Sequence, residues 1–115
     1  MELDVSSRVG GSGAGVNILR SSGNFDLETV DIFTGAALSL LRIDGKPLII
    51  DFSGVGFIDS MGLSGLIAAL THAREAELGL DLVVNTERVS RLLSRTGVDV
   101  LLPIHESLKG ALASN

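Results

Sequence analysis

The chain has 115 residues, the length of one compact domain, and 45% of them are apolar, enough for a substantial core. Only 3% are aromatic and the formal net charge is −5, a composition that disfavours binding to nucleic acids and to anionic membrane surfaces. The chain has no cysteine and only two histidines, His72 and His105, which lack metal-ligand spacing, so the sequence predicts no disulfide, no metal site and no cofactor.

The N-terminal residues predict an edge strand and no targeting segment. Residues 2–9 alternate weakly between apolar and polar, and Glu2 and Asp4 stand where a signal peptide would be apolar. No uninterrupted apolar stretch of the sequence approaches the ~20 residues that a membrane-spanning helix needs. We therefore expect a soluble, cytoplasmic protein without direct membrane insertion.

A glycine-rich segment follows, "GGSGAG" at 10–15. A phosphate-binding loop would lie between a strand and a helix, whereas residues 16–21 alternate like a strand and no Lys-Ser/Thr pair is present. We interpret the segment as a flexible hairpin connection. "SSGN" at 21–24 then predicts a turn.

The first helix is expected after this turn, with Asp26 as its N-cap. Apolar residues recur at helical spacing from Leu27 to Leu41, and "DGKP" at 44–47 ends the element. Residues 48–52, "LIIDF", form a continuous apolar run, which is typical of a parallel strand buried on both faces.

The second half predicts alternating helices and strands. The second helix is expected to have Ser60 as its N-cap and Gly79 as its C-terminal cap. The remaining predicted elements are a strand at 80–84, a helix capped by Asn85 or Thr86 and ended by Gly97, a strand at 98–102 stopped by Pro103, and a helix at 105–112.

The predicted order of elements is β-β-α-β-α-β-α-β-α. Strands that alternate with helices indicate right-handed crossovers and a parallel sheet. The fold class is therefore α/β: one mixed, mostly parallel sheet of four to five strands, with about four helices and an antiparallel N-terminal edge strand.

Two groups of residues were considered as catalytic candidates. Ser64 in "GLSGL" is one residue short of a hydrolase nucleophile elbow and lies inside a predicted helix, where we expect it to aid close packing together with Gly62 and Gly65. Asp51 and Asp59 are both expected near the carboxyl edge of the sheet, but no basic residue or metal motif accompanies them. The simpler interpretation is that Asp51 closes its strand and that Asp59 accepts hydrogen bonds from nearby amides, so we expect no catalytic residue.

The third predicted helix carries Arg88, Arg91 and Arg95 on one stripe. Two interpretations of the stripe remain open: a solvated helix face, or a docking strip for an acidic partner.

Ser60 has a possible role beyond capping. A cap contributes ~1 kcal/mol, but the amides and dipole of a helix N-terminus also favour a phosphate. The adjacent Asp59 would repel that phosphate. A phosphoserine here would change the surface charge by roughly −1.5 to −2, which suits a switch.

Two segments resemble a known family. "LIIDFSGVGFIDSMGLSGLIAAL" at 48–70 resembles the central segment of STAS domains, specifically of bacterial anti-sigma factor antagonists, in which D-[LF]-S-x-V ends a strand and F-[IM]-D-S-[small]-G-L opens a helix. "SGNFDLET" at 22–29 resembles a weaker second motif, G-x-[LF]-D-x-x-T. The resemblance covers essentially the whole chain and implies a single STAS domain at 1–115.

The resemblance implies a role for each matched residue. Ser60 matches the serine that is phosphorylated by a cognate anti-sigma factor, itself a Ser/Thr kinase of the histidine-kinase-like ATPase type. Asp59 matches the acidic residue that contacts this kinase, and Asp26 matches an aspartate whose loop lies beside the phosphorylation site. Met61 and Gly62 complete the implied partner-binding set.

The resemblance also implies a cycle. The unphosphorylated protein would bind the anti-sigma factor and free the sigma factor. Phosphorylation would end this binding, and a metal-dependent Ser/Thr phosphatase would reset Ser60. The protein would then be a substrate and not an enzyme.

Two departures from the family pattern leave alternatives open. Met61 replaces the usual small residue, and "GGSGAG" lengthens the first hairpin. The alternatives are a STAS subunit of a stressosome or of an ABC lipid-transport complex without a phospho-switch, and a nucleotide- or lipid-binding domain. The oligomeric state, monomer or weak dimer, is also left open.

Overall fold

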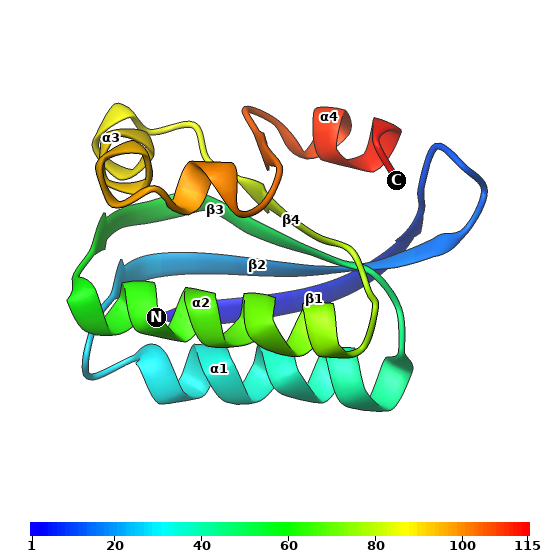
Figure 1. Ribbon diagram of the computed structural model, residues 1–115, viewed down its shortest axis with the longest axis horizontal. Helices are drawn as coiled ribbons and strands as arrows, with labels where there is room; N and C mark the ends of the chain where they lie inside the picture. Colours follow the sequence, from blue (N-terminus) through cyan, green and yellow to red (C-terminus); the bar gives the residue numbers. More distant parts are fainter.

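The computed structural model describes residues 1–115 as one five-stranded sheet with helices on both faces (Figure 1). The strands lie in chain order across the sheet: β1 (Glu2–Val9), β2 (Gly15–Phe25), β3 (Leu48–Ile58), β4 (Leu80–Val83) and β5 (Ile104–His105). The helices are α1 (Val30–Ser39), α2 (Ser60–Glu75), α3 (Glu87–Thr96) and α4 (Leu108–Ala113). β1 pairs antiparallel with β2 and all other pairs are parallel, which confirms the predicted fold class.

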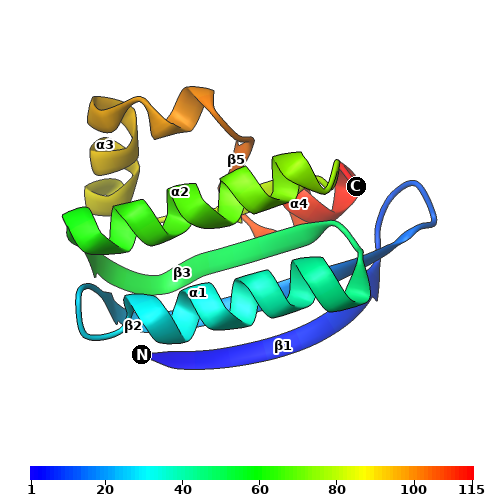
Figure 2. The ribbon, with the colours of Figure 1, turned by 60° about the horizontal axis from the view of Figure 1, so that its bottom comes forward.

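The sheet separates two cores of unequal size. Leu19, Ile50 and Leu82 point to the larger core, which also holds the apolar faces of α1, α2 and α3. The alternate positions Ile18 and Ile49 point to the smaller core beneath α4. The central strands are therefore buried on both faces, as their apolar runs predicted. Figure 2 shows α1 and α2 side by side on one face of the sheet.

Three of the four phenylalanines join β2, α1 and β3. The ring centroids of Phe25 and Phe33 are 4.6 Å apart, and Phe52 lies 5.4 Å and 5.6 Å from them. All three side chains are fully buried, whereas Phe57 is 41% exposed. This cluster packs the end of β2 against the start of α1, and so fixes the segment that contains Asp26.

The predicted turn at 21–24 is wrong, because β2 continues through it to Phe25. The extended part of β2 pairs in parallel with β3, which has the same length. The register of this pairing shifts after Arg20 and again after Gly23, as at β-bulges. α1 consequently begins at Val30 rather than Leu27. A π-helical turn, Leu40–Asp44, follows α1.

The strand predicted at 98–102 is also wrong. Val98–Val100 forms a 3-10 turn, and strand β5 follows Pro103. Val98 and Leu102 are buried while the residues between them are exposed. The two buried residues are four positions apart, which is the spacing of a helical turn. The residue types of the segment, in contrast, are typical of a strand. Gly79 is likewise not the C-terminal cap of α2, which ends at Glu75 with Ala76 as its C-cap, and the left-handed residue that follows is Glu77 (φ 56°).

The glycine-rich segment packs against the end of α4. The amide of Gly11 donates to the carbonyl oxygen of Leu112 at 2.9 Å, and the hydroxyl of Ser12 donates to that of Asn115 at 2.5 Å. A Cβ on Gly10 would lie 2.6 Å from the Asn115 carbonyl carbon. Glycine is therefore required here for close approach as well as for the turn.

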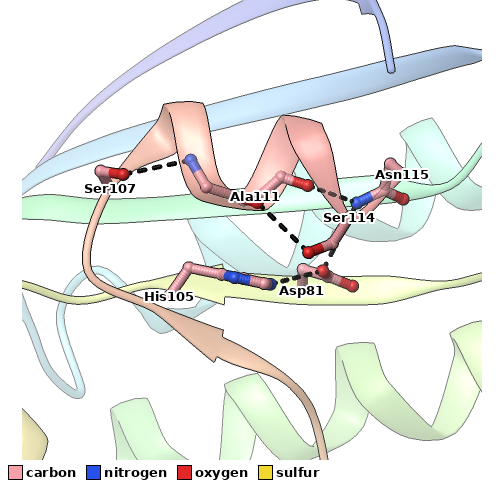
Figure 3. A network of polar contacts seen from close by, with 7 residues as sticks. Asp81, His105, Ser107, Ala111, Ser114 and Asn115 are labelled. Carbon is pink, nitrogen blue, oxygen red and sulfur yellow. Dashed lines mark hydrogen bonds and ion pairs between the residues drawn. The ribbon is translucent and has the colours of Figure 1, made fainter. Parts of the chain in front are cut away.

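Polar contacts hold β5 and the C-terminal residues (Figure 3). Nε2 of His105 lies 2.8 Å from Oδ2 of Asp81, and the Asn115 side-chain amide donates to the same oxygen at 3.4 Å. The hydroxyl of Ser107 caps α4 by accepting from the amide of Gly110 at 3.1 Å. His105 thus has a structural partner. No helix has both the length and the apolar character needed to cross a membrane.

Candidate functional site

The junction between β3 and α2 is capped by Asp59. Its Oδ1 accepts a hydrogen bond from the amide of Gly62 at 2.9 Å, and its own backbone is extended (φ −98°, ψ −176°). This is the geometry of an N-cap residue. The prediction that Ser60 caps α2 is therefore wrong by one position, because β3 runs to Ile58 and leaves Asp59 as the only residue between strand and helix.

Ser60 is the first residue of α2 and is exposed. Its hydroxyl makes no hydrogen bond within the chain, in contrast to Ser64, whose hydroxyl donates to the carbonyl oxygen of Met61 at 2.7 Å. Because Asp59 performs the capping, the Ser60 hydroxyl has no structural task. It is exposed at a helix start whose position Asp59 fixes.

Asp26 organises the neighbouring turn between β2 and α1. Its Oδ1 accepts from the amide of Glu28 at 3.0 Å, and its own amide donates to the hydroxyl of Thr29 at 3.0 Å. Asp26 was expected to cap α1, but that helix starts at Val30 after Thr29. The Asp26 side chain instead stabilises a separate turn that precedes the helix.

The two junctions are joined by Asp59. Its Oδ2 accepts from the amide of Leu27 at 3.4 Å, and its amide donates to the carbonyl oxygen of Phe25 at 3.2 Å. The turn that contains Asp26 and the helix start that contains Ser60 are thus brought side by side. Both lie at the same end of the sheet (Figure 1).

Two glycines bring α2 close to this turn and to α1. A Cβ on Gly62 would overlap the carbonyl oxygen of Phe25, and one on Gly65 would lie 2.5 Å from Cγ2 of Val30. Glycine is needed at both positions for close approach. The expectation of tight packing is confirmed for Gly62 and Gly65 but is wrong for Ser64, which is exposed.

Three apolar side chains are exposed around Ser60. Leu27 is 65% exposed, Met61 42% and Phe57 41%. Leu27 was expected to face inward as part of α1, and the exposure of Phe57 was not predicted. They lie on the three segments that meet at Asp59, to which Asp26 and Asp59 add carboxylates, and exposed apolar and charged groups occur together where proteins bind one another.

Asp51 belongs to the scaffold and not to this surface. It lies within β3 rather than closing its strand, and it is 3% exposed. Its Oδ2 is 3.3 Å from Nε of Arg20, and its Oδ1 accepts from the amide of Ser53 at 2.9 Å. Asp51 therefore does not close its strand as expected, whereas Asp59 accepts hydrogen bonds from nearby amides as expected. The structure contains no cluster of side chains suited to a metal ion.

Comparison with known proteins places these features in a family. The model of the STAS domain matches residues 12–111. A comparison with curated protein sequences gives no match.

Solved structures share the fold at low sequence identity. A Thermotoga maritima protein proposed to be an anti-sigma factor antagonist is 22% identical, with a TM-score of 0.80 over 92% of this chain and 89% of its own. An anti-sigma factor antagonist from Mycobacterium paratuberculosis is 26% identical, with a TM-score of 0.73 over 95% and 92%. SpoIIAA of Bacillus is 13% identical in its unphosphorylated form, with a TM-score of 0.69 over 96% and 93%, and its phosphorylated form is also known.

Proposed function

The chain belongs to the STAS domain family, and we propose that it is an anti-sigma factor antagonist whose binding is switched off by phosphorylation of Ser60. The proposal rests on one observation at the start of α2: the residue that caps the helix is not the residue that would be phosphorylated. Asp59 caps the helix, while the adjacent Ser60 is exposed with a free hydroxyl. A kinase can therefore modify Ser60 without removing a hydrogen bond that the fold needs.

The partner surface consists of Asp26, Asp59, Ser60, Met61 and Gly62, to which we add Leu27. Gly62 contributes by letting α2 approach Phe25, and Met61 and Leu27 contribute exposed apolar area. Asp26 and Asp59 would face basic groups of the partner. The similarity to the anti-sigma factor antagonist from Mycobacterium paratuberculosis supports a partner of the same class.

Phosphorylation would act through charge. It adds about −1.5 to −2 beside the carboxylates of Asp59 and Asp26. In the free protein water solvates this charge, and the amides of the first turn partly offset it. In a complex the same charge would lie in a contact from which water has been removed, where an uncompensated charge is costly. The switch would therefore change binding and leave the fold intact.

The proposed cycle has three partners in the bacterial cytoplasm. The unphosphorylated protein binds an anti-sigma factor, which is a Ser/Thr kinase of the histidine-kinase-like ATPase type, and the sigma factor is released. The kinase then phosphorylates Ser60, and a Ser/Thr phosphatase removes the phosphate. The protein itself performs no catalysis.

The experiment is a kinase reaction with site mapping. The purified protein is incubated with ATP and with each anti-sigma kinase encoded near its gene, and the modified residue is located by mass spectrometry. We expect phosphate on Ser60 and none on the Ser60→Ala variant. The matched control is Ser64→Ala, one turn further along the exposed side of α2, which should remain a substrate. Modification of another residue, or of none by any of these kinases, would contradict the proposal.

Met61 favours one alternative, a STAS subunit with a constitutive partner. A larger residue stands where the family's kinase-recognised segment has a small one. If this residue prevents kinase recognition, the same surface would serve a stressosome or a transport complex. A complex that forms equally well with Ser60 and with Ser60→Asp would identify this function.

A further inference from the structure

A groove separates α3 from the end of β3. It has a volume of about 150 Å³. Its lining residues are Phe57, Ile58, Arg88, Val89, Leu92 and Arg95. On α3, Arg88, Leu92 and Arg95 follow each other at helical spacing, so one stripe of the helix borders the groove. Four apolar residues and two arginines thus line the groove.

The arginines of this stripe differ in their partners. Arg91 pairs with Glu87 on the exposed side of α3. Arg88 and Arg95 are exposed and form neither a hydrogen bond nor an ion pair within the chain. The chain carries a net charge of −5, so two unpaired positive charges beside one groove form a local field of opposite sign.

The groove is lined by Phe57, the one phenylalanine of the chain that is not fully buried. Phe25, Phe33 and Phe52 are fully buried, but Phe57 is 41% exposed beside the partly buried Leu92. Arginine and phenylalanine are enriched in protein interfaces, where guanidinium groups bind carboxylates bidentately and aromatic rings supply apolar area. The combination fits an acidic segment with an apolar anchor.

We propose that this groove docks an acidic amphipathic helix of the same partner that binds at Ser60. The inference rests on the proposed function in one respect, because it assigns the groove to the partner proposed for Ser60. Phe57 and Ile58 of the groove directly precede Asp59 at the end of β3, so the groove and the start of α2 meet at this strand end. α3 packs against β3, the strand that leads into the start of α2. A single partner can therefore contact both.

The spacing of the arginines specifies the occupant further. Arg95 lies seven positions after Arg88 on α3, a rise of about 10.5 Å at 1.5 Å per residue. A partner helix lying along α3 would place two carboxylates at this distance if its acidic residues were also seven positions apart. An apolar residue midway between them would face Phe57 and Leu92. An acidic helix of this pattern would complement a basic groove on an acidic protein, and the charge difference would also speed association.

The chemistry disfavours a nucleic acid as the occupant. Glu87 precedes Arg88 on α3 and Asp59 follows Ile58 of the groove, so a polyanion would meet carboxylates as well as the two unpaired arginines. Neutralising only two phosphates supplies little of the counterion release on which such binding depends.

The first experiment uses a defined peptide and does not depend on any kinase. The probe is a helical, alanine-rich peptide with Glu at two positions seven apart and Leu at the third and fourth positions after the first Glu. It is titrated into the ¹⁵N-labelled protein, and backbone amide shifts are followed by NMR. We expect shifts concentrated at Phe57, Arg88, Leu92 and Arg95. The same peptide with Lys in place of Glu should cause none.

Two outcomes of the peptide experiment would overturn the inference. One is shifts that are absent or scattered over other faces. The other is a single-stranded oligonucleotide that shifts the same amides more strongly than the acidic peptide does, which would assign the groove to nucleic acid.

The second experiment uses the kinase identified by phosphorylation of Ser60. The Arg88→Glu/Arg95→Glu variant is compared with Arg8→Glu/Arg42→Glu, which makes the same charge change at exposed sites away from α3. Circular dichroism first verifies that both variants are folded. We expect the groove variant to bind the kinase at least about tenfold more weakly than the wild type, while the control stays within about twofold.

The outcomes separate this inference from the proposed function. If both arginine variants bind the kinase equally well and Ser60 is still phosphorylated, the docking role of the groove is wrong, while the phosphorylation switch at Ser60 is unaffected. If no residue is phosphorylated, the proposed switch is contradicted. The peptide experiment would then still test whether the groove binds an acidic helix.

Discussion

Oδ1 of Asp59 accepts a hydrogen bond from the amide of Gly62 at 2.9 Å, so the residue before Ser60 caps the helix that Ser60 begins. The second oxygen of the same carboxylate accepts from the amide of Leu27, in the turn beside it. One side chain thus holds both segments of the candidate partner surface. Ser60 is left exposed, with no part in the cap.

The cap predicts different costs for two adjacent substitutions. Asp59→Ala should lower the free energy of unfolding by about 0.5–2 kcal/mol, because the amide of Gly62 loses its acceptor. Ser60→Ala should change it by less than about 0.5 kcal/mol, as is usual for an exposed residue without partners. Urea denaturation of both variants measures the difference, and an equal loss in the two would return the capping role to Ser60.

Asp59→Asn separates capping from charge. Asparagine is as good an N-cap as aspartate, so its oxygen can still accept from the amide of Gly62, and only the long hydrogen bond from the amide of Leu27 at 3.4 Å is lost. The free energy of unfolding should therefore fall less than in Asp59→Ala. If the carboxylate also faces a basic group of the kinase, the affinity for the kinase should fall by more than this small loss of stability explains. Titration calorimetry against the kinase, combined with the denaturation curve, tests both statements.

Close approach of α2 to its neighbours predicts opposite effects of one substitution at two glycines. Gly65→Ala should destabilise the protein by about 1–3 kcal/mol, because the new methyl group overlaps Val30. Gly35→Ala on α1 meets no atom within 4 Å and should stabilise it by about 0.5–1 kcal/mol, the usual gain of alanine over glycine within a helix. Thermal melts that moved in the same direction for both would refute this account of the packing.

Met61 is predicted to act on binding and not on stability. Its side chain is 42% exposed, and Ile67 on the same helix is 40% exposed, which makes it a matched control. Met61→Ala should weaken binding of the partner by about tenfold, or 1.4 kcal/mol, as expected for an apolar anchor at an interface. Ile67→Ala should leave it unchanged. The melting temperatures of the two variants verify that neither effect arises from unfolding.

Periodicity was sufficient to predict most of the fold. The apolar runs at 48–52 and 80–84 are buried on both faces of a parallel sheet, and α2 lies between them where the spacing predicted a helix. The prediction of a strand at 98–102 was wrong because two signals conflict there. The spacing of Val98 and Leu102 is that of a helical turn, whereas their residue types are typical of a strand. Only the tertiary environment distinguishes the two.

The errors at the candidate site have one local cause. β2 and β3 each extend several residues beyond their apolar runs, because each pairs with the other. Aspartate and serine are equally good N-caps, so the pair "DS" does not by itself determine whether Asp59 or Ser60 caps α2. The end of β3 at Ile58 determines it. The same extension moved the start of α1 to Val30 and exposed Leu27, which the helical spacing had placed inside.

The central claim is that charge on Ser60 switches binding off, and the affinity of two Ser60 variants for the anti-sigma kinase tests it most directly. Titration calorimetry should find Ser60→Ala within about twofold of the wild type, because an exposed hydroxyl without partners contributes little. Ser60→Asp should bind about 100-fold or more weakly, since an unpaired charge in a desolvated contact costs about 3 kcal/mol or more. Equal affinities for the two variants, both folded, would contradict the account.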